Sequence, residues 1–389
     1  MFGGRIGARR RNRLALISLA AGDRNRAAEV AGAALAGLRV RRHRLPAATA
    51  RADVLMALAT AAEEARNHDD AIGHLRAAVE VLQAVRRSAM RDVWLSEVFT
   101  RLGDTLRLAG RYGQASEMLA AAYQLAEQNP KELLRMAAIC NAQGILAKDT
   151  GHFGEAEGHY AQAQLLTTQV LGPDTPEAAG IYHNVAGLLH VQGPFDEAEP
   201  AIRTALELRE RADPPDPVGV AADTSVLGAV LAGQERLPEA EAALQTALRM
   251  WQAHFGPDHY EVAVQLHNLA AIQQKKKAFA AAEAGYLEAF LIKERVLGEG
   301  HPEIAALLNN LASLRSDEGR TTESLELYDR ALAIFGSTLG PDHPNTKVCE
   351  ANRLHVVGPA RESRLRPQAE DCVAATVAMT PNPGPRRFR

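Results

Sequence analysis

The chain has 389 residues, a hydrophobic fraction of 47%, a charged fraction of 23% and a formal net charge of −3 at pH 7. This small net charge gives no overall electrostatic case for a nucleic-acid partner. The three cysteines, Cys140, Cys349 and Cys372, are widely spaced and form no CxxC motif, so we expect reduced thiols and a cytoplasmic protein.

The composition favours helices. Alanine, the residue with the highest helix propensity, is abundant, and alternating β-branched runs are few. No apolar run approaches the ~20 residues that a membrane-spanning helix needs, so we expect no membrane partner.

The first 44 residues contain eleven arginines, which only Asp23 and Glu29 oppose. One interpretation is a basic patch for phosphate or an acidic partner, and the favoured one is a solvated end of the chain. Arg9-Arg10-Arg11 followed by Leu14 to Ala21 also imitates a signal peptide, but the apolar run is short and a helix is favoured. We expect residues 1–8 to be disordered.

From residue 9 onward the sequence predicts helices in pairs. Small residues recur in register every 42 residues, as at Ala205, Ala247, Ala289 and Ala331, and small residues let two helix axes approach to about 8–10 Å. A last half unit follows the pairs, and we expect it to cap the open end of the array. The predicted helices are 9–21 and 24–40, 47–66 and 69–87, 91–109 and 112–128, 131–149 and 153–170, 174–192 and 195–212, 217–233 and 237–254, 259–276 and 279–297, 301–317 and 321–338, and the cap 344–357.

The linkers between the later pairs repeat with the same period. Gly298-Glu299-Gly300-His301-Pro302 has the pattern of the linker at 340–344, and the linkers at 256–260 and 172–176 fit the same register. Self-similarity at a fixed period of this size indicates a solenoid. We therefore predict an all-α fold, a right-handed α-solenoid (superhelix) of about eight helix-turn-helix repeats plus a capping helix.

Three linker histidines, His259, His301 and His343, also fall in register. Successive repeats place them about 10 Å apart, which is too far to share a metal ion bound at ~2.0–2.1 Å. We therefore expect them to cap the helices that follow, and we predict no metal site.

The repeat pattern ends after Val357. Residues 358–389 are rich in proline and arginine and are predicted to be a disordered tail. Two alternatives stay open: the tail folds back on the array through its short apolar run, Cys372 to Met379, or it carries a basic signal at 386–389.

The motif Leu308-Asn309-Asn310-Leu311-Ala312 and the repeated linkers resemble the tetratricopeptide repeat family. The resemblance covers most of residues 9–357, with degenerate repeats at 9–170 and 42-residue repeats of the kinesin-light-chain type, including the capping helix, at 171–357. We find no heptad segment of the kind with which a kinesin light chain joins its heavy chain. The resemblance is therefore to the repeat module and not to the motor subunit.

The resemblance implies that the first helix of each pair lines a concave groove, where the Asn of Asn-Leu-Ala can bind the backbone of an extended peptide. In the 42-residue register the position between Asn184 and Asn268 is Val226, which has no side-chain amide. In the subfamily that grips a C-terminal carboxylate, a further Asn follows three residues later, and that position is Gly187, Ala271 or Ser313 here. The alternative is that the amides tie neighbouring helices together. The candidate groove residues are Asn184, Asn268 and Asn310, with His183, His267 and Asn309 preceding them.

The sequence contains no GxxxxGK[ST], HExxH or GxSxG motif. We therefore predict a non-enzymatic protein–protein interaction scaffold without cofactors that binds a peptide or a partner protein and no specific nucleic acid. Two alternatives are a regulatory sensor that controls an effector and the repeat part of a larger enzyme system. The run Lys275-Lys276-Lys277 is interpreted as a solvated helix end, with a charge pair to Asp317-Glu318 of the next repeat as an addition.

Overall fold

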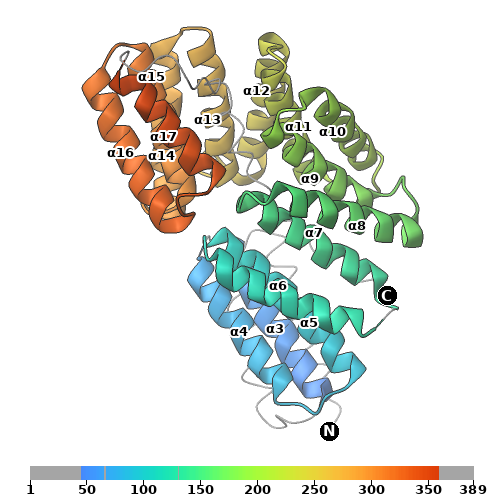
Figure 1. Cartoon of the computed structure of the whole chain (residues 1–389). Coiled ribbons are helices and arrows are strands. Elements are labelled where there is room, and N and C mark those ends of the chain that lie inside the picture. Colours follow the sequence, from blue (N-terminus) through green and yellow to red (C-terminus); the bar gives the residue numbers. More distant parts are fainter. Residues whose placement is uncertain (1–44, 65–66, 130, 359–389) are drawn as a thin grey trace. The chain divides into compact units, whose positions relative to one another are not determined.

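The computed structural model describes residues 45–64, 67–129 and 131–358. Within these ranges the chain forms fifteen α-helices and no strand, and the helices follow one another in pairs (Figure 1). The expected all-α solenoid is therefore confirmed for the described residues. The predicted first pair at 9–40, the expected disorder at 1–8 and the tail beyond Gly358 lie outside the described residues.

The chain divides into two compact units, residues 1–146 and 147–389, and each is described by itself. The first unit contains α3 (Leu45–Glu64), α4 (His68–Gln83), α5 (Ala89–Leu108), α6 (Tyr112–Glu127) and most of α7 (Leu133–Asp149). The second unit contains α8 (Phe153–Leu171), α9 (Pro176–Gln192), α10 (Phe195–Glu210), α11 (Pro217–Gly233), α12 (Leu237–Phe255), α13 (Tyr260–Lys275), α14 (Phe279–Leu297), α15 (Pro302–Asp317), α16 (Thr321–Thr338) and α17 (Pro344–Val357).

Several observed bounds coincide with the predicted ones, namely those of α11, α14, α16 and α17. Helix ends are predictable here because the residues that end and begin helices act locally. Gly256 and Gly298 close α12 and α14 with φ of 87° and 82°, a left-handed backbone that glycine adopts without steric cost.

The three linker histidines cap the next helices, as predicted. Nδ1 of His259 accepts a hydrogen bond from the Glu261 amide at 3.2 Å, and Nδ1 of His301 accepts one from the Glu303 amide at 3.2 Å. His343 does the same for α17. Each cap satisfies one of the backbone N–H groups that the first turn of a helix leaves without an intrahelical partner.

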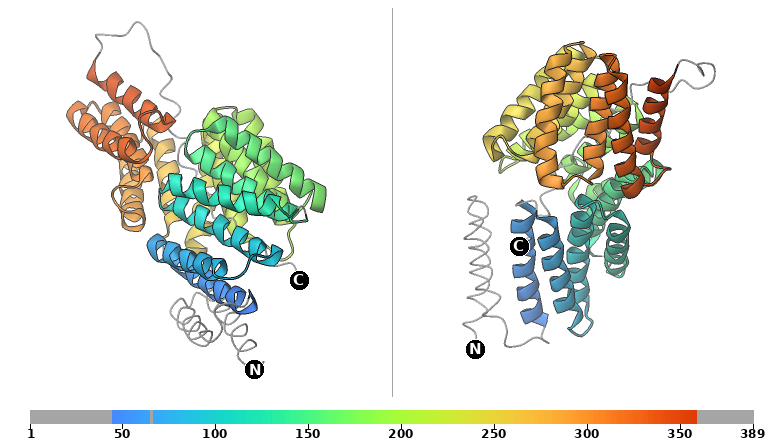
Figure 2. Two further views of the ribbon diagram at one scale, coloured as in Figure 1. Left: turned by 60° about the horizontal axis from the view of Figure 1, so that its bottom comes forward. Right: turned by 90° about the vertical axis from the view of Figure 1, so that its left-hand side faces the viewer.

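The core of the second unit lies between the two helices of each pair and between successive pairs. Consecutive helices pack against each other from α8 to α17, and the two further views in Figure 2 show them side by side. Close approach depends on small residues, as at Gly228, where a Cβ atom would lie 2.7 Å from Cγ of Leu244. The predicted close-packing residues in register are all fully buried, namely Ala198, Ala240, Ala282, Ser324, Ala205, Ala247, Ala289 and Ala331.

The first unit is built on the same plan. Leu75, Leu82 and Leu106 are fully buried in its core. The Arg101 guanidinium pairs with Glu63 at 2.7 Å and thereby links α5 to α3. Arg101 occupies the repeat position at which the later repeats carry an asparagine. None of the helices in the described ranges is both long and apolar enough to cross a membrane.

The second unit also contains a contact between its two ends. Nε2 of His343, in the loop before α17, lies 3.1 Å from the carbonyl oxygen of Asp149, which is 194 residues earlier. The next turn fits against the same loop: a Cβ atom on Gly151 would lie 2.5 Å from Cδ of Pro344. The last repeat of the unit therefore packs against the residues that begin it.

Candidate functional site

The six candidate groove residues lie on the first helices of three pairs: His183 and Asn184 on α9, His267 and Asn268 on α13, and Asn309 and Asn310 on α15. All six side chains are buried. Their hydrogen bonds show which of them contact each other.

Three of these side chains, together with Asn352, form a chain of hydrogen bonds across α13, α15 and α17, which we call the amide ladder. Nδ2 of Asn310 donates to Nε2 of His267 at 2.6 Å, and Nδ2 of Asn309 donates to Oδ1 of Asn310 at 3.2 Å. One repeat later, Nδ2 of Asn352 donates to Oδ1 of Asn309 at 3.2 Å. The ladder ties neighbouring first helices together, which is the alternative role considered for these amides.

His267 is neutral in the ladder. Burial, with a smaller contribution from the nearby Lys293 ammonium, lowers the pKa of this imidazole to about 3. A neutral ring has one nitrogen with a free lone pair, and this is what allows Nε2 to accept from the Asn310 amide.

At the other end of the register, His183 belongs to a buried ionic cluster. Its Nδ1 lies 2.6 Å from Oδ1 of Asp223 on α11, and Nε of Arg209 donates to Oδ2 of the same carboxylate at 2.8 Å. Arg209 also pairs with Asp216, which caps α11 through the Gly219 amide. Sequence reasoning missed Asp223, although a lone carboxylate in the middle of an apolar helix is a signal for a buried partner.

Two polar side chains outside the ladder, His183 on α9 and Asn268 on α13, lie on the helices that flank α11. Nε2 of His183 is buried and has no hydrogen-bond partner among the described residues. The Asn268 side chain is 4% exposed and makes no hydrogen bond to a described residue. In the 42-residue register, α11 supplies Ser225 and Val226 where α15 supplies Asn309 and Asn310.

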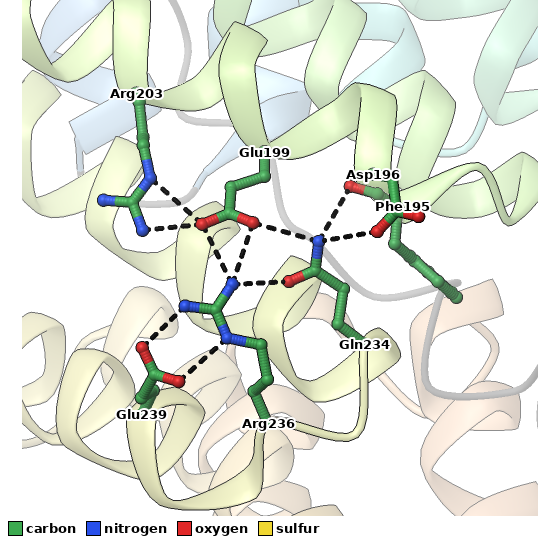
Figure 3. A network of polar contacts seen from close by, with 7 residues as sticks. All are labelled: Phe195, Asp196, Glu199, Arg203, Gln234, Arg236 and Glu239. Atoms are coloured by element: carbon green, nitrogen blue, oxygen red, sulfur yellow. Dashed lines mark hydrogen bonds and ion pairs between the residues drawn. The ribbon is translucent and has the colours of Figure 1, made fainter.

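A second polar array links each second helix to the following pair. Every 42 residues a second helix carries a glutamate whose carboxylate accepts hydrogen bonds from the following pair. The donors lie at the end of the first helix of that pair or just beyond it. The glutamates are Glu157, Glu199, Glu241 and Glu283. Figure 3 shows the densest case, in which Glu199 binds Arg203, Gln234 and Arg236. The Arg203 side chain and the other donors lower the pKa of Glu199 to about 2. The 42-residue spacing of these glutamates is visible in the sequence.

The lysines at the end of α13 take part in this array. Lys275 pairs with Glu235 at 2.5 Å and Lys276 pairs with Glu241 at 3.0 Å, both in the preceding repeat. The predicted charge pair to the next repeat is therefore wrong in direction, because the neighbour of Asp317 is the uncharged Gln274, at 2.7 Å.

A buried ion pair joins α14 to α15. Nζ of Lys293, fully buried, lies 2.9 Å from Oε2 of Glu303, and the Tyr260 hydroxyl donates to the same carboxylate at 2.5–2.6 Å. Burial alone would raise the pKa of Glu303, but the charge of Lys293, with smaller contributions from His301 and Tyr260, brings it down to about 2. In the part of the chain that the structure describes, no group of three or more His, Cys, Asp or Glu side chains could hold a metal ion.

A family model described as "Tetratricopeptide repeat" matches residues 220–295 and 303–353. No curated protein sequence matches the chain significantly. Among solved structures, a Rap conjugation gene regulator of the plasmid pLS20 in complex with the Phr* peptide is 16% identical, with 77% of this chain and 79% of that chain covered at a TM-score of 0.60.

Two further solved structures are similar over most of their length. A Rap protein complexed with Competence and Sporulation Factor is 12% identical, with 91% of this chain and 98% of that chain covered at a TM-score of 0.56. NprR in complex with its cognate peptide NprX is also 12% identical, with 78% and 82% covered at a TM-score of 0.56. At these identities the likeness concerns the fold. The matched segments at residues 220–295 and 303–353 are tetratricopeptide repeats, and the stacked helix pairs of the described residues have the same architecture.

Proposed function

We propose that this protein is a non-enzymatic, cytoplasmic interaction scaffold that binds an extended peptide, or an extended segment of a partner protein, along the first helices of its later repeats. The proposed site comprises the predicted groove residues, and the proposed repeat domain spans residues 171–357. The degenerate repeats at 9–170 are proposed to extend the array rather than to bind the peptide.

The observation that carries the proposal is the unused amide of Asn268. A side-chain amide offers both a donor and an acceptor, which is the combination that an extended peptide backbone requires. Asn268 lies at the middle of the array and bonds to none of the described residues, whereas Asn310 in the same register is engaged by His267. An amide held in a helical scaffold without a partner is suited to a ligand.

The comparisons support a peptide ligand by analogy of fold. Three of the similar structures were solved with a bound peptide or factor, as their descriptions state. One of them is described as a gene regulator. That description favours a second candidate function for this chain, in which peptide binding controls an effector.

Selection from a library of random dodecapeptides displayed on phage tests the proposal. Wild-type protein should retain a defined set of peptides, and the double variant Asn268→Ala/Asn310→Ala should weaken their binding by roughly ten- to a hundredfold, because each lost hydrogen bond contributes about 0.5–1.5 kcal/mol. Gln252→Ala, which removes an exposed amide from α12, is the matched control and should bind normally. Retention of no peptide by the folded wild-type protein would refute the function.

A further inference from the structure

We propose that the exposed face of α14 is a self-association surface, on which a second copy of this chain packs about a two-fold axis that runs along the helix. This face belongs to the second helix of a pair and contains none of the candidate groove residues. The inference therefore goes beyond the proposed function and does not depend on it.

The exposed face of α14 is apolar over most of its length, and we call it the α14 stripe. Leu287 and Leu291 are 44% and 65% exposed. The rest of the stripe consists of Ala280, Ala281 and Ala284, which are also exposed. Spacings of three and four residues place side chains next to each other on one side of a helix, so these five residues form a continuous strip.

At the same repeat positions the other second helices of the unit are mostly polar. The position of Ala281 is a glutamate in the other four helices, namely Glu155, Glu197, Glu239 and Glu323. The position of Leu287 is polar in α10, α12 and α16, where it holds Arg203, Gln245 and Asp329. An apolar strip at positions that the array otherwise keeps polar indicates a surface that another molecule covers.

The flank of the stripe that faces the preceding repeat carries a negative charge. Glu288 and Arg295 are seven residues apart, which is close to two helical turns, so they lie on the same side of α14. Arg295 pairs at 2.8 Å with Asp258, which lies in the linker before α13. Glu288 therefore lies on the side of α14 towards the preceding linker.

The flank that faces the following repeat carries a positive charge. Glu283, on the other side of α14, pairs with Arg315 near the end of α15. Helix α16 follows α15 and packs against it, and its Arg330 side chain is exposed. The stripe therefore lies between an exposed carboxylate on one flank and an exposed guanidinium on the other.

These two charges make the surface complementary to itself. Glu288 and Arg330 occupy the same repeat position, 42 residues apart, and neither forms a hydrogen bond or an ion pair within the described part of the chain. A two-fold axis along α14 exchanges the flanks, so Glu288 of each copy lies opposite Arg330 of the other while the leucines pack together. An axis across α14 would instead bring like charges together.

The size of the stripe sets the expected strength of association. From residue 280 to residue 291 it extends roughly 17 Å along the helix at about 1.5 Å per residue. Such a contact is at the small end of the range for protein pairs, so we expect a dissociation constant in the micromolar range.

Sedimentation velocity of the full chain across micromolar concentrations tests the proposal. Wild type should shift from the monomer mass towards twice that mass as the concentration rises. Leu291→Glu places a charge at the two-fold axis and should weaken association at least roughly tenfold. Leu165→Glu is the matched control and should associate like wild type, because Leu165 has the same repeat position on α8, is 61% exposed and lies outside the stripe.

Charge variants test the orientation of the two copies. Glu288→Arg and Arg330→Glu each replace two attractive pairs with repulsive ones and should weaken association roughly two- to thirtyfold. The double variant Glu288→Arg/Arg330→Glu reverses both charges and should restore association to within about threefold of wild type.

A wild-type protein that stays monomeric throughout would overturn the proposal, and so would equal effects of Leu291→Glu and Leu165→Glu. A double charge variant that associates no more tightly than the single ones would overturn the two-fold arrangement along α14. Circular dichroism of each variant checks that it is folded. Peptide binding is measured separately by the dodecapeptide selection, so failure of either proposal is distinguishable from failure of the other.

Discussion

At the scale of single residues, the Lys293–Glu303 pair combines two opposing effects. Burial of the ammonium is costly, and the carboxylate offsets that cost only because both groups are held in contact and Tyr260 supplies a further hydrogen bond. The equivalent positions in other repeats hold Arg209, Trp251 and Phe335. This buried position therefore accepts cations and aromatic residues alike, provided that each cation has its own carboxylate.

We predict that Glu303→Gln destabilises the protein by roughly 3–5 kcal/mol, since it leaves Lys293 buried without its counter-charge. Urea denaturation followed by circular dichroism measures the change. Glu177→Gln is the control, because Glu177 occupies the same repeat position on α9 but is exposed. The double variant Lys293→Met/Glu303→Leu should recover most of the loss, and a double variant as unstable as the single one would contradict the assigned pairing.

The same pair predicts a dependence on pH. The pKa of Glu303 is depressed to about 2 in the folded protein, so its stabilising contribution is complete above the pKa of the unfolded chain, about 4.3, and is lost as the pH falls towards 2. Thermal melts between pH 6 and pH 2 should show a steeper loss for wild type than for the double variant Lys293→Met/Glu303→Leu. Parallel curves would show that other carboxylates dominate acid unfolding.

At the scale of helices, the register of glutamates fixes each second helix to the following pair. Glu199 on α10 accepts from Gln234 and Arg236 in the turn that leads to α12, and Arg236 also binds Glu239 (Figure 3). The Glu199 side chain is only 18% exposed. Because several donors share one shielded carboxylate, this network should be stronger than an isolated surface pair.

We therefore predict that Glu199→Gln costs roughly 1–3 kcal/mol, the range for hydrogen bonds to charged groups. Glu157→Gln is the control in the same register: Glu157 is exposed and binds only Gln192 among the described residues, so about 0.5 kcal/mol or less is expected. Chemical denaturation of both variants provides the comparison. Equal losses would show that the network around Arg236 adds nothing to the single contact.

At the scale of the whole unit, the first and the last described helices of the second unit are joined by contacts between the loops beside them. His343 caps α17 through Nδ1 and binds the Asp149 carbonyl through Nε2, and a Cβ atom on Gly151 would lie 2.5 Å from Cδ of Pro344. The other linker histidines share the capping role. The contact with the beginning of the unit is made by the last linker.

We predict that Gly151→Ala destabilises the second unit by more than Gly172→Ala does. Both glycines have positive φ, 78° and 94°, so alanine is strained at either position by of the order of 1 kcal/mol. Only at Gly151 would the new methyl group also clash with Pro344. The radius of gyration from small-angle scattering should increase for Gly151→Ala alone, and an identical increase in both variants would exclude the closing contact as the cause.

The sequence by itself determined the helix pairs, their bounds and the roles of the linkers. These features depend on the period of small and apolar residues and on glycine and histidine at helix ends, and such signals act within one or two turns. It also identified most of the amide ladder, since Asn310 follows the 42-residue register of the amides and His267 and Asn309 precede the amide of their repeats. The same reasoning could not say which of them were already engaged by another side chain.

Only the tertiary structure decided the partners. Asp223 meets His183 and Arg209, Lys293 meets Glu303, and His343 meets Asp149 because packed helices bring together residues that lie between 10 and 194 positions apart in the chain. Side-chain contacts of this kind depend on rotamers and on the exact stacking of helices, which no local pattern specifies.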